Sequence, residues 1–159
     1  MVAVKSKKTY VAKPKDLHPQ WHLFDASKQP LGRMAVQISK VLQGKHRSIY
    51  TPNINTGDFV VVVNASKVFL TGKKILQRKH YFHSGYPGGM RELTTEELLQ
   101  KNPTKVVELA VRGMLPKNTL SKQMLKRLKI YSGFSNPHVA QIAGYGTTEA
   151  KELNEILNG

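Results

Sequence analysis

The lysine and arginine side chains of this sequence are the groups whose number and spacing indicate a chemistry. The 159 residues include 25 Lys and Arg against 10 Asp and Glu, a formal net charge of +15. No acid lies between residues 26 and 57, 59 and 91, or 109 and 148. A compact domain gains nothing from such self-repulsion, which a polyanion would relieve. RNA, DNA and an anionic membrane surface are therefore the partner classes that the charge indicates.

Motifs for nucleotide chemistry or hydrolysis are missing. The run from Gly72 to Lys74 is only a fragment of a phosphate-binding loop, because Lys67 stands where the first glycine belongs. Neither a Gly-x-Gly-x-x-Gly fingerprint nor a Gly-x-Ser-x-Gly elbow occurs. Asp25 and Asp58 lie near expected strand ends, where open sheets often place active sites. Capping of a helix or turn is favoured for both.

The histidines do not predict a metal site, and cysteine is absent, which rules out disulfides and thiolate zinc sites. His80 and His83 are three residues apart in an expected strand, so their side chains point to opposite faces. His46 lies between Lys45 and Arg47 and is assigned to a basic patch. The other histidines are isolated in the sequence: His18, His22 and His138. We expect no metal and no cofactor.

Membrane spanning is not expected. The longest purely aliphatic or aromatic run, Phe59 to Val63, is far shorter than the ~20 residues of a spanning helix. No signal peptide is visible, and the lack of arginine in the first segment argues weakly against a transit peptide.

A strand, a helix and a second strand open the expected domain. Trp21 to Asp25 is a short aromatic strand, and apolar residues from Leu31 to Leu42 follow helical spacing until Gly44. Phe59 to Ala65 is almost wholly apolar, which is typical of a strand buried on both faces of a parallel sheet. This order predicts a right-handed βαβ unit.

The second half alternates expected strands, loops and helices. Lys79 to His83 reads as a strand, followed by a glycine-rich loop from Ser84 to Gly89. Composition leaves this loop open as either an RNA contact or a plain connection. Thr94 with Glu97 predicts a capping box, and Asn102 with Pro103 predicts the start of the next helix.

The last expected elements lie beyond Pro116. Leu120, Met124 and Leu128 predict one face of a third helix. Another face of that helix is expected to carry a basic row: Lys122, Lys126 and Lys129. A last strand is expected to start at Ile130 and Tyr131, and residues 147 to 157 to form a small amphipathic helix.

Two segments are the most specific motifs of this sequence, Val111-Arg112-Gly113-Met114-Leu115-Pro116-Lys117-Asn118 and Leu128-Lys129-Ile130-Tyr131-Ser132-Gly133. Through them the sequence resembles the universal ribosomal protein L13 family of the bacterial type. Earlier matches include Leu31-Gly32-Arg33-Met34-Ala35, Gly44-Lys45-His46 and His83-Ser84-Gly85. The resemblance covers roughly residues 7 to 141 and departs from the family pattern after Gln141.

The resemblance implies an α/β fold with three layers, α/β/α, around a four-stranded, mostly parallel sheet. Residues 1–19 are expected to form a basic arm, residues 20–141 the single domain, and residues 142–159 an acidic tail. The family implies a structural, non-enzymatic protein that binds large-subunit ribosomal RNA, acts early in subunit assembly and touches neighbouring ribosomal proteins. The expected location is the bacterial cytoplasmic ribosome, with an organellar ribosome as the alternative.

The candidate RNA-binding residues come from the arm and the acid-free stretches. They are Lys7, Lys8, Arg33, Lys40, Lys45, His46, Arg47, Lys73, Lys74, His83, Arg91, Arg112, Lys117, Lys122, Lys126 and Arg127. Two other hypotheses stay open. A nucleotide-using enzyme would rely on Asp25, Asp58 and Lys74, and a DNA-binding protein is compatible with the charge alone.

Overall fold

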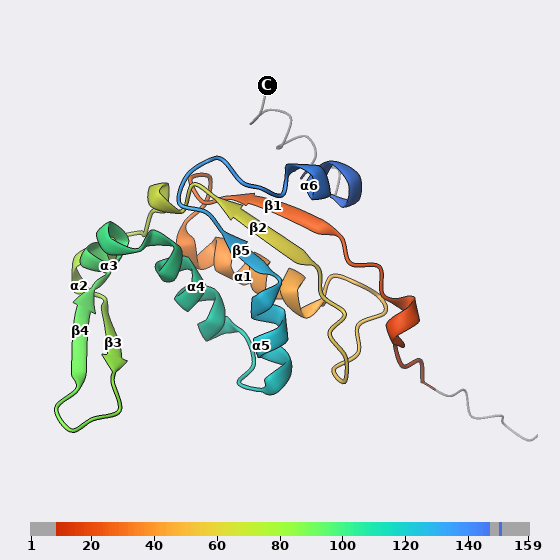
Figure 1. The fold of residues 1–159 in the computed structure, drawn as a ribbon, viewed down its shortest axis with the longest axis horizontal. Helices are drawn as coiled ribbons and strands as arrows, with labels where there is room; N and C mark the ends of the chain where they lie inside the picture. Colours follow the sequence, from red (N-terminus) through yellow and green to blue (C-terminus); the bar gives the residue numbers. More distant parts are fainter. Residues whose placement is uncertain (1–8, 147–149, 151–159) are drawn as a thin grey trace, which may run out of the picture.

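The computed structural model describes residues 9–146 and Ala150. Its centre is a parallel sheet in the order β1-β2-β5, formed by β1 (Trp21–Asp25), β2 (Phe59–Val63) and β5 (Leu128–Ile130) (Figure 1). The apolar run that predicted a doubly buried strand forms the central strand β2, so that prediction is confirmed.

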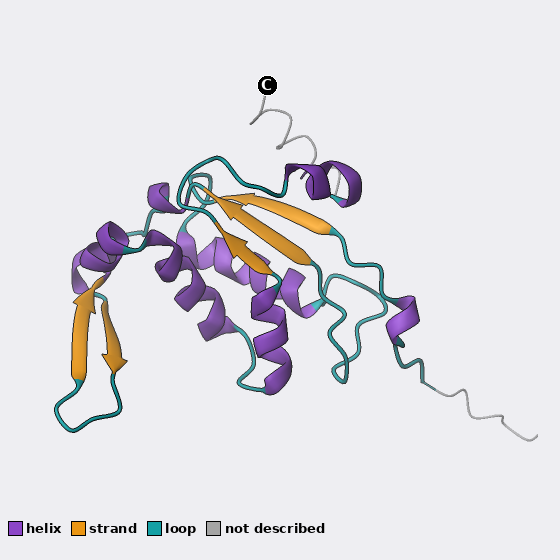
Figure 2. Cartoon of the chain, viewed as in Figure 1, coloured by secondary structure: helices purple, strands orange, loops and turns teal. Residues whose placement is uncertain are grey.

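Helices cover both faces of this sheet (Figure 2). On one face lie α1 (Leu31–Gln43), α4 (Pro103–Met114) and α5 (Thr119–Lys126). Val60 and Val62 belong to the core on this side. Val61 and Val63 point to the other side and are buried with Ile142 of α6 (Val139–Tyr145). The alternation of β2 side chains therefore divides the core into two parts.

A hairpin projects from one end of the sheet (Figure 1). It pairs β3 (Lys79–His83) with β4 (Met90–Thr94) in antiparallel register, between the short helix α2 (Lys74–Gln77) and α3 (Thr95–Lys101). The strand over residues 79–83 was predicted, whereas β4 and the pairing were not. Two 3₁₀ turns, η1 (Pro14–Asp16) and η2 (Ala65–Lys67), complete the described elements.

The predicted helix boundaries are confirmed where a cap marks them. Gly44 ends α1 in a left-handed conformation with φ of 79°. Thr94 and Glu97 form the capping box of α3, and the Asn102 side chain accepts a hydrogen bond from the backbone of Lys105 at the start of α4. Each prediction rested on residues within one turn of each other, which is why it held.

The expected third helix was wrong at its end. Leu128 lies in β5 and not in α5, because α5 ends at Lys126 and the chain turns into the sheet beside β2. Lys129 is therefore not part of a basic row on the helix. The last strand also starts earlier than expected, and Tyr131 lies beyond it.

The α/β class and the parallel sheet are confirmed, and the described residues contribute three strands to that sheet. The fourth strand stays a prediction. An isolated parallel bridge joins Trp21 to Gly146, at the edge of β1 that β2 leaves open. The expected helix over residues 147–157 lies outside the described residues. None of the described helices has the length and apolar character needed to cross a membrane.

Gly57 is where the end of α1 and the start of β2 come into contact. A Cβ built at Gly57 would lie 1.8 Å from the carbonyl oxygen of Leu42, which is backbone and cannot rotate away. Gly113, in α4, would meet nothing within 4 Å. Gly57 is therefore packed against backbone, whereas Gly113 has open space where a side chain would lie.

We expect Gly57→Ala to lower the free energy of unfolding by about 1–3 kcal/mol, the cost of forcing atoms into a packed contact. Gly113→Ala should instead raise it by roughly 0.5–1 kcal/mol, because alanine favours the helix. Urea denaturation of both variants measures the difference. Equal effects would contradict the close approach at Gly57.

Candidate nucleic-acid interface

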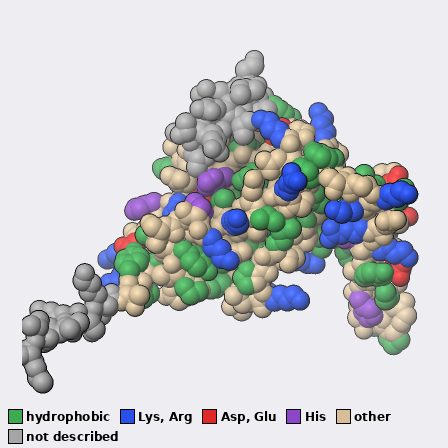
Figure 3. Space-filling model, turned by 180° about the vertical axis from the view of Figure 1, so that it is seen from behind, with side chains coloured by type: hydrophobic (Ala, Val, Ile, Leu, Met, Phe, Trp, Pro, Cys, Tyr) green, Lys and Arg blue, Asp and Glu red, His purple; other side chains and the backbone are tan. Residues whose placement is uncertain are grey.

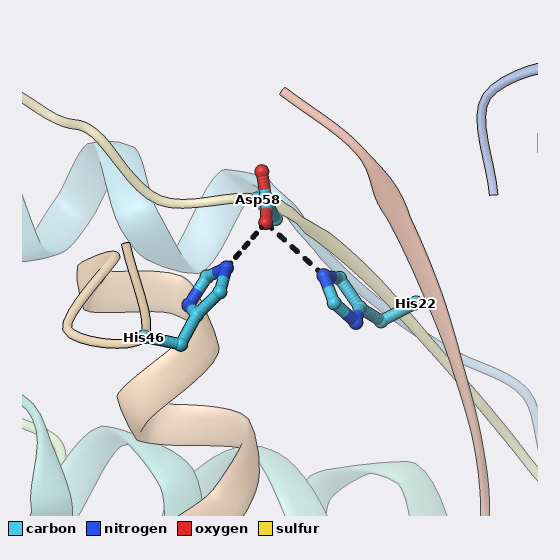
Figure 4. A group of neighbouring side chains, drawn as sticks. All are labelled: His22, His46 and Asp58. Carbon is cyan, nitrogen blue, oxygen red and sulfur yellow. Dashed lines mark hydrogen bonds and ion pairs between the residues drawn. The ribbon is translucent and has the colours of Figure 1, made fainter. Parts of the chain in front are cut away.

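The carboxylate of Asp58 is fully buried and lies at the centre of a side-chain cluster (Figure 4). Nε2 of His22 is 3.1 Å and Nε2 of His46 is 2.8 Å from its Oδ2 atom. Its Oδ1 atom accepts hydrogen bonds from the Gln20 backbone N–H, at 2.8 Å, and from the Arg47 guanidinium. Four donors from the segment before β1, β1 itself and the loop after α1 thus meet on one acid.

The Asp58 carboxylate is ionised. Burial raises its pKa, but hydrogen bonds from His22 and the Gln20 backbone and the charge of Arg47 outweigh burial, and the net pKa lies below the ordinary value. An ionised carboxylate only accepts hydrogen bonds. His22 and His46 must therefore each carry a proton on Nε2.

A second arginine extends this cluster to β5. Arg127 donates to the Gly57 carbonyl, and its guanidinium lies 5.4 Å from the ring centroid of Phe59. Trp21 stacks on the same ring with centroids 4.7 Å apart. Burial lowers the pKa of Arg127, although Asp58 acts in the opposite direction. The starts of all three parallel strands are thereby fixed to one another.

The cluster contains three potential metal ligands, His22, His46 and Asp58, whose ligand atoms lie within 4.8 Å of one another. The carboxylate offers about four acceptor positions, and the four donors occupy them. The permanent charge of Arg47 also opposes a cation at this place. The geometry therefore favours a structural ion-pair cluster over a metal site.

The positions of the acids also argue against the hypothesis that the chain is a nucleotide-using enzyme. Asp58 precedes β2, whereas Asp25 ends β1, so the two acids lie at opposite ends of the parallel sheet. Asp25 accepts hydrogen bonds from Ser27 and Asn64, which is the turn role expected for it. Asp58 has a structural role, but it joins three segments and does not cap one turn.

Most candidate RNA-binding residues are exposed. On the face in Figure 3, Lys and Arg side chains recur across the body, whereas Asp and Glu are few. The exposed candidates are Arg33, Lys40, Lys45, His46, Lys73, Lys74, His83, Arg91, Arg112, Lys117, Lys122 and Lys126. Arg47 and Arg127 are partly buried by their contacts with Asp58 and Gly57. Lys7 and Lys8 lie outside the described residues.

The structure brings some candidates together and leaves others apart. Arg33 and Lys74, 41 positions apart by their numbers, line one cavity. Lys45 lines another cavity with Pro116 and Asn118, which places the loop after α1 beside the α4–α5 connection. Lys122 and Lys126 share a face of α5 through their spacing of four. Together these residues form several basic surfaces rather than one.

Sequence reasoning missed two residues, one in the Asp58 cluster and one in a basic surface. His22 was treated as isolated, but it shares Asp58 with His46, 24 positions later by number. Arg78 lines the same cavity as Arg33 and Lys74. No local pattern reveals His22, whereas Arg78 belongs to an acid-free stretch that had already been noted.

We expect Asp58→Asn to lower the free energy of unfolding by about 3 kcal/mol, because it breaks a buried ion pair. Glu96→Gln removes one exposed acid from the first turn of α3 and should cost less than about 1 kcal/mol. Denaturant titration of both variants at neutral pH measures the comparison. Similar values would contradict a central role for Asp58.

The pH dependence follows from the lowered pKa of Asp58. The unfolded chain binds this proton more readily, so the contribution of Asp58 is complete above a pH of about 4 and is lost as the pH falls through the folded pKa. The stability difference between wild type and Asp58→Asn should therefore shrink in acid. A constant difference from pH 7 to pH 2 would count against ionised Asp58.

Comparison with known proteins supplies the family. Residues 19–137 match the family model described as "Ribosomal protein L13". Two relatives called "Large ribosomal subunit protein uL13", from Natranaerobius thermophilus and Nitrosococcus oceani, are both 53% identical and cover 84% of this chain and 93% and 94% of their own lengths. A third, from Thermotoga petrophila, is 51% identical over 85% of this chain and 91% of its own length. The match spans β1 through β5 and includes every residue of the Asp58 cluster, so this chain belongs to the ribosomal protein L13 family.

Proposed function

We propose that this chain binds large-subunit ribosomal RNA mainly through phosphate contacts and supports an early step of subunit assembly. As a member of its family it is a structural protein of the large ribosomal subunit and not an enzyme. One observation carries the RNA proposal. Among the lysines and arginines that the structure describes, only Arg47, Lys79 and Lys105 form ion pairs with a carboxylate.

The other lysines and arginines of residues 9–146 are available to a partner outside the chain. Solvated surfaces usually mix charges of both signs, whereas most exposed lysines and arginines of these described residues have no described acid within ion-pair distance. Phosphate and sugar receive half or more of the contacts in nucleic-acid complexes, and phosphate contacts release counterions. The proposed interface therefore consists of many weak, salt-sensitive contacts.

The loop at the tip of the β3–β4 hairpin supports a second kind of contact. Tyr86 is 76% exposed, and the neighbouring strands expose Tyr81 and Met90. Gly85 and Gly88 adopt positive φ values of 91° and 71°, which glycine adopts without strain. Exposed aromatic rings beside cations stack on unpaired RNA bases. We therefore favour an RNA contact over a plain connecting loop.

Several finer features belong to the same proposal. The chain would have a basic arm over residues 1–19, a domain over residues 20–141 with a fourth strand in its sheet, and an acidic tail over residues 142–159. It would touch neighbouring proteins of the subunit and need neither a membrane nor a small-molecule substrate. The bacterial relatives favour a cytoplasmic bacterial ribosome over an organellar one.

Binding to large-subunit ribosomal RNA should weaken steeply with salt. We expect the double variant Lys122→Gln/Lys126→Gln to reduce the slope of log affinity against log salt by about two units, one for each lost phosphate contact. Lys105→Gln is the matched control, because Lys105 already pairs with Glu108 at 2.9 Å. Filter binding at a series of salt concentrations measures each slope.

Two results would contradict this proposal. One is an affinity that does not change with salt. The other is equal affinity for duplex DNA and ribosomal RNA at physiological salt, which would favour the DNA-binding hypothesis.

Tyr86→Ala tests the hairpin contact separately. Loss of one base stack should lower the affinity for ribosomal RNA by about tenfold, within the ~1–3 kcal/mol range of such contacts, with little change in salt slope. Tyr145→Ala is the control, since Tyr145 is 72% exposed on α6 and carries no proposed contact. Equal affinities for the two variants would indicate that the loop only connects β3 to β4 and makes no RNA contact.

A further inference from the structure

An open cavity lies between the start of α1, the loop before α2, and the end of α4. Its volume is about 340 Å³, at the lower end of the range of ~300–1,000 Å³ in which proteins bind small ligands. Its wall segments, residues 30–33 and 70–78, come after the carboxyl ends of β1 and β2. Open α/β sheets bind ligands on this side.

One side of the cavity is cationic. Arg33, Lys74 and Arg78 contribute three positive charges, and no Asp or Glu lines the wall. None of the three forms an ion pair within the part of the chain that the structure describes. The Lys74 ammonium donates instead to the hydroxyl of Thr71, at 3.3 Å. Such convergence of unpaired cations, two of them arginines, is suited to a phosphate group.

The other side of the cavity is apolar. Leu70 and Ala110 line it, and Met114, 39% exposed at the end of α4, lies beside them. A bare phosphate ion would gain nothing from this wall, whereas a ribose or base would be partly removed from water against it. The cavity therefore joins a phosphate-binding side to a side that fits the rest of a nucleotide.

We propose that this cavity binds one nucleotide unit, with its phosphate at Arg33, Lys74 and Arg78 and its sugar or base against Leu70 and Met114. The phosphate chemistry is the same for a nucleotide within ribosomal RNA and for a free nucleotide. The RNA form of this inference rests on the proposed function. It adds Arg78, Thr71 and the apolar wall, none of which the charge pattern had assigned.

The test uses the full chain and three variants. Lys74→Gln/Arg78→Gln removes two cavity cations, and Met114→Ser makes the wall polar. Lys105→Gln removes a lysine of α4 that lies outside the cavity and already pairs with Glu108. Circular dichroism checks that each variant folds. Affinity for large-subunit ribosomal RNA is measured across salt concentrations, and AMP and inorganic phosphate are titrated separately against the wild type and the double variant.

The expected result has two parts. The double variant should bind ribosomal RNA about tenfold more weakly and lose about two units of salt slope, whereas Lys105→Gln should change neither. Met114→Ser should weaken RNA binding without changing the slope, which a site for phosphate alone would not do. AMP binding that the double variant abolishes would identify a free nucleotide as an occupant, and RNA effects without AMP binding would identify RNA alone.

Other results would overturn the inference. If the wild type binds ribosomal RNA, and the double variant matches Lys105→Gln with RNA and the wild type with AMP, the cavity proposal fails and the proposed function stands. If Met114→Ser has no effect and phosphate binds as tightly as AMP, the cavity binds phosphate alone, and its assignment to a nucleotide is wrong. If the wild type binds no ribosomal RNA, the proposed function fails, and the AMP titration alone decides the cavity proposal: binding supports it and no binding overturns it.

Discussion

The buried carboxylate of Asp58 joins segments that are far apart in the sequence. It accepts hydrogen bonds from the Gln20 backbone, His22, His46 and Arg47, so the entry to β1 and the loop after α1 are both fixed to the start of β2. Removing any one donor leaves a charge without water and with fewer partners. The amino ends of the strands therefore depend on a single ionised group.

This cluster divides the basic residues into two classes. Arg47 and Arg127 direct their guanidinium groups to Asp58 and to the Gly57 carbonyl, and so hold the fold together. Lys45 lies in the same segment as Arg47 and remains exposed. His46 belongs to both classes, because its Nε2 contacts Asp58 while the residue stays exposed. A charge count treats these residues alike, whereas an RNA would meet only the exposed class directly.

The sequence predicted what local patterns determine. The stripe that ends at Gly44, the apolar run of β2 and the capping residues of α3 and α4 each involve neighbours along the chain, and each was confirmed. Leu128 was misplaced because its spacing fits both a helix and the strand that follows. Only pairing with Val60 of β2 decides between them.

The candidate site could be predicted less well than the fold. His22 and Asp58 are 36 positions apart, and Arg33 and Arg78 reach one cavity from different elements. Such contacts depend on the three-dimensional arrangement, which composition does not contain. Charge nevertheless indicated the class of partner, because a deficit of acids over long stretches needs no structure to be visible.

The central claim is that this chain is a component of the large ribosomal subunit and that contacts with RNA hold it there. Sucrose-gradient sedimentation of a native extract, with the chain followed at low and high salt, tests it most directly. We predict migration with the large subunit or its precursors that survives a moderate salt wash and is lost at high salt. A position at the top of the gradient at low salt, with none of the chain in ribosomal or precursor fractions, would contradict the claim.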